Sequence, residues 1–67
     1  MLTGTVKFYH AERGYGYIAP DNGDRDLFFD TANLETPNRH IAEGQRVEYE
    51  KTLGRKGPEA IKIRTLS

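Results

Sequence analysis

Residues 13–30 read RGYGYIAPDNGDRDLFFD, and this stretch indicates the fold class most directly. It holds two short strand signals, at Tyr15–Ala19 and Asp26–Asp30, in which aromatic and aliphatic residues alternate with small or polar ones. The Pro-Asp-Asn-Gly sequence at 20–23 consists of residues that favour tight turns. The pattern therefore predicts two strands joined by a hairpin turn.

Similar strand signals lie on both sides of this hairpin. Further strands are expected over Thr3–His10, Arg46–Lys51 and Ala60–Thr65. Five short strands at near-regular spacing, without a helix-length amphipathic segment, predict an all-β sandwich or barrel. The exception is Thr31–Ala42, a long and weakly patterned connection that we expect to hold one helical or 3₁₀ turn around Ala32–Leu34.

The alternation of apolar residues also predicts the core. Its expected members are Val6, Ile18, Leu27, Phe29, Leu34, Ile41, Val47, Tyr49, Ile61 and Ile63. Leu34 and Ile41 would anchor the long connection. About ten apolar side chains suffice for a small closed barrel, which has no exposed strand edges.

The composition of the 67-residue chain excludes several classes of protein. It has no Cys, which excludes disulfides, thiolate metal sites and thiol catalysis. The mean hydropathy of -0.76 reflects a sequence without an apolar run near the ~20 residues of a membrane span. Because no secretion signal is visible either, we expect a cytoplasmic protein.

The formal net charge is zero, with ten basic and ten acidic residues, but it is an average over opposed segments. Residues 1–18 carry +1 and residues 51–67 carry +4, whereas residues 19–30 carry -3 and residues 31–50 carry -2. Long-range attraction to a polyanion is therefore not expected to dominate, although locally basic surfaces can form.

Several aromatic residues are not needed by the predicted core. If Ile18 faces inward, alternation places Tyr15 and Tyr17 together on the outer face. By the same reasoning Phe28 faces outward, and with Phe8 these rings would form an aromatic platform edged by Lys7 and Arg13. Bases of any identity stack on such platforms, for about 1–3 kcal/mol each.

Three segments carry a resemblance to a known family: GTVKFY at 4–9, RGYGYI at 13–18 and DLFF at 26–29. Together with EGQRV at 43–47 and GRKGPEA at 54–60, they resemble the signatures of cold shock domains, in order and over nearly the entire chain. The resemblance implies one cold-shock-type domain over residues 1–67, folded as a five-stranded antiparallel OB-fold β-barrel. It also implies binding of single-stranded DNA or RNA, and a role as an RNA chaperone or as a regulator of transcription or translation under stress.

The resemblance also assigns binding residues. The positions that match the family's binding residues are Lys7, Phe8, Tyr9, His10, Arg13, Tyr15, Tyr17, Phe28, Arg55 and Lys56, with Asp30 at a position that departs from the family. Phe8 stands where the family usually has Trp, and Asp30 where it usually has His. Thr31 and Asn38 stand where it often has Phe.

These departures predict weaker binding than the family norm, with a shorter footprint, because stacking rings are missing and Asp30 would face a polyanion. An alternative role for Asp30 is to accept a hydrogen bond from a base amino group. The competing hypothesis is a protein-interaction or vestigial OB domain with little nucleic-acid binding.

No residues in the chain form a recognisable catalytic or cofactor site. His10 and His40 lack metal-type spacing to carboxylates, and Asp21–Asp26 lacks the bidentate acid of a calcium loop. We therefore expect no enzymatic activity, cofactor or metal. The expected state is a monomer, with a domain-swapped dimer through residues 31–42 as the alternative.

Overall fold

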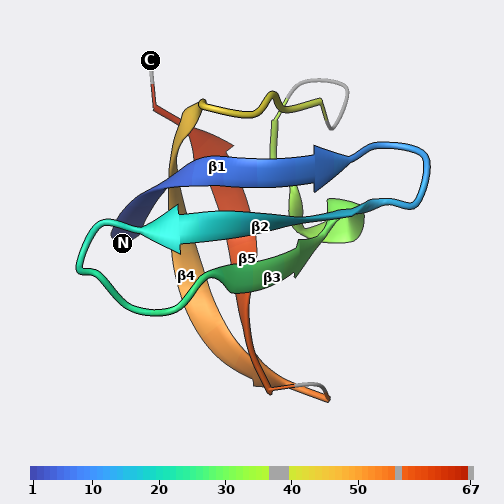
Figure 1. The fold of residues 1–67 in the computed structure, drawn as a ribbon. Coiled ribbons are helices and arrows are strands. Elements are labelled where there is room, and N and C mark those ends of the chain that lie inside the picture. The colour runs from blue at the N-terminus through green and yellow to red at the C-terminus, as the bar shows by residue number, and fades with distance from the viewer. Residues whose placement is uncertain (37–39, 56, 67) are drawn as a thin grey trace.

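The computed structural model describes residues 1–36, 40–55 and 57–66, and within them the regular structure is almost entirely β. Its elements are β1 (Leu2–His10), β2 (Tyr15–Pro20), β3 (Leu27–Asp30), the 3₁₀ helix η1 (Thr31–Asn33), β4 (Arg46–Gly54) and β5 (Gly57–Thr65). The predicted all-β class is confirmed. The last two strands run further than expected and form a long hairpin that projects from the rest of the molecule (Figure 1).

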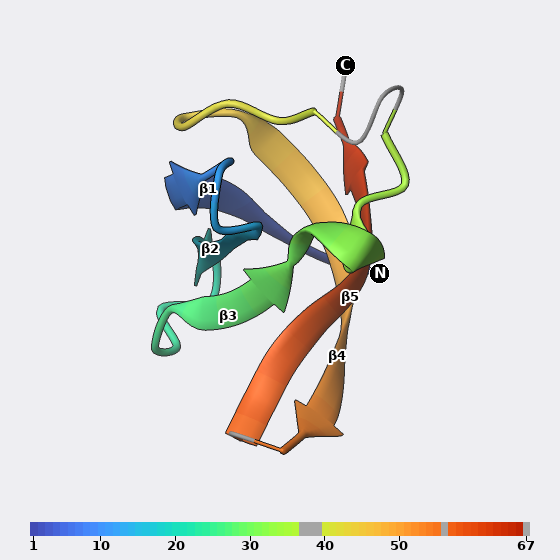
Figure 2. The ribbon, with the colours of Figure 1, turned by 90° about the vertical axis from the view of Figure 1, so that its right-hand side faces the viewer.

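The five strands close into a barrel in the order β1-β2-β3-β5-β4. Neighbouring strands are antiparallel except β3 and β5, which meet in a short parallel contact between Phe28 and Glu59. β1, β2 and β3 lie side by side as one wall, and β4 and β5 cross behind them (Figures 1 and 2). This arrangement confirms the predicted five-stranded OB-type barrel.

The core between these walls contains every predicted residue except Ile61. Ile61 is half-buried, and its neighbour Ala60 is fully buried instead, so the prediction for Ile61 was wrong. The cause is an irregularity in β5, where the pairing shifts by one residue and Lys62 has a positive φ of 51°. An extra residue of this kind reverses the inward and outward positions on either side of it, so Ala60 and Ile63 both face inward.

β1 contains a similar irregularity that affects the outer surface. Val6 pairs with Ile18, but Phe8 pairs with Tyr17, so Lys7 is the extra residue of a β-bulge. Strict alternation would place Val6 and Phe8 on the same face. Because of the bulge, Val6 is buried while Phe8 is exposed.

The connection between β3 and β4 begins with the expected 3₁₀ turn, and Leu34 and Ile41 are buried as predicted. The side chain of Asp30 caps this turn by accepting a hydrogen bond from the Ala32 N–H at 2.9 Å. Asn38 lies outside the described residues.

Candidate nucleic-acid interface

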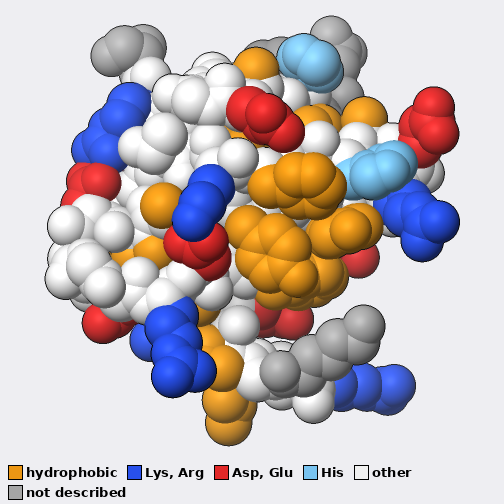
Figure 3. Space-filling model, in the orientation of Figure 1, with side chains coloured by type: hydrophobic (Ala, Val, Ile, Leu, Met, Phe, Trp, Pro, Cys, Tyr) orange, Lys and Arg blue, Asp and Glu red, His pale blue; other side chains and the backbone are white. Residues whose placement is uncertain are grey.

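The outer face of β1, β2 and β3 presents six side chains in two rows that run across the strands. Residues that lie directly opposite each other on paired strands share a face, so the rows follow from the register. The first row is Phe8, Tyr17 and Phe28, and the second row is His10, Tyr15 and Asp30. Figure 3 shows a continuous hydrophobic area over these strands, with a His and basic groups at its margin.

The five rings of these rows contact one another, and we call them the aromatic patch: Phe8, His10, Tyr15, Tyr17 and Phe28. Tyr15 lies at the centre, with ring centroids 5.8 Å from Phe8 and 5.9 Å from Phe28. The His10 ring is nearly parallel to the Tyr15 ring, with an interplanar angle of 16°. Phe8 and Tyr17 keep 38% and 37% of their surface exposed, so the patch offers accessible aromatic surface to a ligand while its rings pack against one another.

Tyr9 is the one described aromatic residue of the expected site that lies outside the patch. Its ring packs against the core and stacks on Phe29 at 6.0 Å with an interplanar angle of 10°. Gly16 makes room for this packing, because a Cβ there would lie 2.7 Å from Phe29 Cζ. The core side of the sheet, behind the patch, is therefore packed by Tyr9, Phe29 and Gly16.

The basic residues of the expected site lie in different parts of the fold. Lys7 forms an ion pair with Asp26 at 3.1 Å, and both side chains remain accessible to solvent. Arg13 is exposed in the loop after β1, where its backbone N–H donates a hydrogen bond to His10 Nδ1 at 3.4 Å. Arg55 is exposed at the β4–β5 turn, and Lys56 lies outside the described residues.

A groove adjoining the patch adds residues that the sequence did not indicate. It has a volume of about 590 Å³, shares Tyr17 and Phe28 with the patch, and is also lined by Lys51 and Pro58. The loop at 24–26 forms its other side. The closing contact between β3 and β5 brings Lys51 and Pro58 here, so no local sequence pattern could have placed them.

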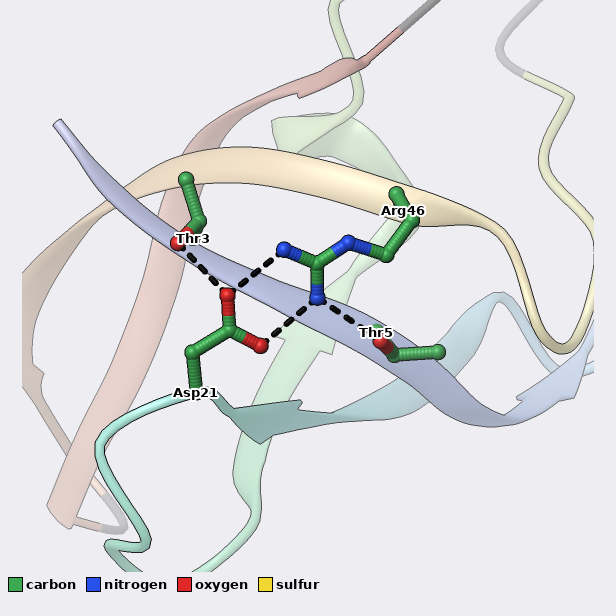
Figure 4. A network of polar contacts seen from close by, with 4 residues as sticks. All are labelled: Thr3, Thr5, Asp21 and Arg46. Carbon is green, nitrogen blue, oxygen red and sulfur yellow. Dashed lines mark hydrogen bonds and ion pairs between the residues drawn. The ribbon is translucent and has the colours of Figure 1, made fainter.

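A polar network outside the patch joins β1, the loop after β2 and β4 (Figure 4). Both nitrogens of the Arg46 fork donate to the Asp21 carboxylate at 2.6 Å, and Thr3 Oγ1 donates to it at 2.7 Å. Arg46 also donates to Thr5 Oγ1 at 3.0 Å. The hydrogen bonds from Arg46 and Thr3 lower the pKa of Asp21 to about 2.

Across residues 1–36, 40–55 and 57–66, no group of three or more His, Asp or Glu side chains is placed to hold a metal ion. In the same residues no helix is long and apolar enough to cross a membrane.

The closed five-stranded barrel with an outward aromatic face defines an OB-type protein. The 'Cold-shock' DNA-binding domain model matches residues 2–66, and the chain belongs to this family. This finding confirms the family resemblance seen in the sequence motifs.

Similar proteins cover nearly the whole chain. The cold shock-like protein CspA of Bordetella pertussis is 42% identical, over 98% of this chain and 100% of the relative. The cold shock-like protein CspE of Escherichia coli is 40% identical, over 92% of this chain and 91% of the relative. Among solved structures, drosophila Unr CSD456 matches 98% of this chain with a TM-score of 0.84. At 23% identity that match supports the fold alone, and this chain spans 26% of that longer chain.

Proposed function

We propose that this protein binds single-stranded DNA or RNA by stacking bases on the aromatic patch. The observation that carries the proposal is the contiguity of the five rings on the outer face of three neighbouring strands. Exposed aromatic rings on an OB-type barrel stack bases with little dependence on sequence. Lys7, Arg13, Arg55 and Lys56 would contact phosphates around the patch.

The second row of the interface is the basis for proposing modest affinity. It ends in the carboxylate of Asp30, and the next residue, Thr31, has no ring to continue the patch. Fewer stacked bases and a local negative charge both reduce affinity for a polyanion. Weak, sequence-tolerant binding suits an RNA chaperone that traps unpaired strands, or a regulator of transcription or translation.

We take the binding unit to be a monomer, because strands of one chain close the barrel completely. Similarity to bacterial cold shock proteins supports a cytoplasmic location.

The test is titration of fluorescently labelled oligo-dT and mixed-sequence RNA with the wild type and a Tyr15→Ala, Phe28→Ala double variant. Each stacked base contributes about 1–3 kcal/mol, so loss of both rings should weaken binding by at least about thirtyfold. Circular dichroism during thermal unfolding confirms that the variant is folded at the temperature of the titration.

Leu66→Ala is the matched control, because Leu66 is exposed to the same extent as Tyr17, 37%, but follows β5 outside the patch. It should leave binding unchanged. Equal affinities of the folded double variant and the wild type would contradict the proposal. Absence of binding by the wild type would instead favour the protein-interaction or vestigial domain, which the neutral net charge and Asp30 also suit.

A further inference from the structure

Asp30 places a carboxylate in the second row of the interface, at a position where an aromatic or neutral side chain could stand instead. It lies directly opposite Tyr15, the central ring of the patch, and two residues beyond Phe28 on the same strand. Both relations place its carboxylate on the outer face, at the end of the second row. A base stacked on Tyr15 would therefore have a carboxylate beside its edge.

The carboxylate is held in place and remains able to accept another hydrogen bond. Its Oδ1 atom accepts from the Ala32 N–H at 2.9 Å, which fixes the side chain at the start of η1. In the described part of the chain no Lys or Arg nitrogen lies within ion-pair distance of Asp30. Asp30 is exposed, so its second carboxylate oxygen, Oδ2, can accept a hydrogen bond from a ligand.

We propose that Asp30 makes the base position at Tyr15 selective for bases that present an exocyclic amino group, so that cytosine binds better than uracil or thymine. The cytosine N4 amino group donates to a carboxylate, as in direct readout by Asp and Glu. Uracil and thymine present the O4 carbonyl at that position, and two acceptors facing each other repel. This inference rests on the proposed function and specifies which base the patch prefers.

The experiment compares single-stranded oligo-dC and oligo-dU of equal length, about seven nucleotides, at pH 7.5 by competition against one labelled probe. These bases have the same ring size, and dU lacks the thymine methyl group, so the amino-to-carbonyl change dominates the comparison. The wild type should bind oligo-dC at least about fivefold more tightly. An oligonucleotide of N4,N4-dimethyldeoxycytidine, which cannot donate from N4, should lose this advantage.

Asp30→Asn is the decisive variant, because Asn caps a helical turn about as well as Asp. The neutral amide can both accept and donate, so the preference should fall to within about twofold. Glu12→Gln is the control, because it removes a negative charge from the exposed loop before β2, outside both rows. A substitution that acts only by removing a negative charge should raise the affinity for oligo-dC and oligo-dU equally, and so leave the ratio of the two affinities unchanged.

The outcomes separate the selectivity from the binding function. A wild type that prefers oligo-dU, or a dC-to-dU ratio that Asp30→Asn leaves unchanged, overturns the role of Asp30 while the binding function stands. If no oligonucleotide binds, the proposed function itself fails. A preference for dC that Asp30→Asn abolishes and Glu12→Gln preserves supports the selectivity.

Discussion

The position of Gly16 is the tightest point behind the aromatic patch. A Cβ at this residue would overlap the Phe8 carbonyl oxygen and lie 2.8 Å from Phe29 Cε1. Neither neighbour can move freely, because one belongs to the β1 backbone and the other to a fully buried ring. Gly16→Ala should therefore lower the free energy of unfolding by about 1–3 kcal/mol, the usual cost of overpacking, as measured by urea denaturation.

Gly23→Asn is the control for this prediction. Gly23 has a positive φ of 84°, but nothing lies within 4 Å of a Cβ built on it. Asn adopts positive φ more readily than most residues, so the cost should be much smaller than at Gly16. If both variants unfolded at the same urea concentration, close packing at Gly16 would not be the cause.

At the scale of elements, the contact between Asp21 and Arg46 joins the loop after β2 to the first residue of β4 across β1. Hydrogen bonds from Arg46 and Thr3 lower the Asp21 pKa from 3.8 to about 2. A carboxyl group with a lowered pKa in the folded state stabilises the fold above its unfolded-state pKa. This contribution is complete above about pH 5 and is lost as the pH falls through 3.8 toward 2.

Asp21→Asn should therefore be less stable than the wild type at pH 6, and most of the difference should be lost by pH 2. Urea unfolding of both proteins between pH 6 and pH 2 measures it. Asp24→Asn is the control, because Asp24 bonds to Asn22 within its own loop and not to a strand. A difference between the wild type and Asp21→Asn that stayed constant down to pH 2 would rule out the ion pair as its source.

The strands also show where sequence reasoning succeeds and where it stops. In β2 and β3, strict alternation places Ile18 and Phe29 inward and Tyr17 outward, as predicted. In β1 and β5, bulges at Lys7 and Lys62 shift the alternation. No residue type marks these bulges, because their cause is the fit of one strand to its partner in the closed barrel. Ile61 was consequently misplaced.

At the scale of the whole molecule, the interface depends on barrel closure. The alternation within residues 13–30 was enough to assign Tyr15, Tyr17 and Phe28 to the outer face. Lys51 and Pro58 reach the adjoining groove only because β5 meets β3. The ion pair between Lys7 and Asp26 likewise joins β1 to the loop before β3, 19 positions along the chain. Such contacts between distant segments have no local sequence signal.

The dependence of binding on salt follows from the number of phosphate contacts. Lys7 counts among them although it pairs with Asp26 in the free protein, because the cations released on binding come from the nucleic acid and not from the protein. With Arg13, Arg55 and Lys56, the proposed interface has up to four phosphate contacts. Each contact with a single strand contributes about -0.7 to the slope of log K against log salt, so we expect a slope of about -2 to -3.

Arg55→Ala should make this slope shallower by about 0.7, because the turn at the end of the β4–β5 hairpin would lose one phosphate contact. Arg64→Ala is the control, since Arg64 pairs with Glu35 at 3.1 Å outside the aromatic patch and its groove. Oligo-dT titrations between 50 mM and 300 mM salt give the slopes of the wild type and of the two variants.

A slope near zero for the wild type would contradict phosphate contacts altogether, whereas equal slopes for Arg55→Ala and the wild type would remove only the hairpin from the interface. With zero net charge and few phosphate contacts, the affinity that remains at high salt measures what the aromatic patch contributes by stacking alone.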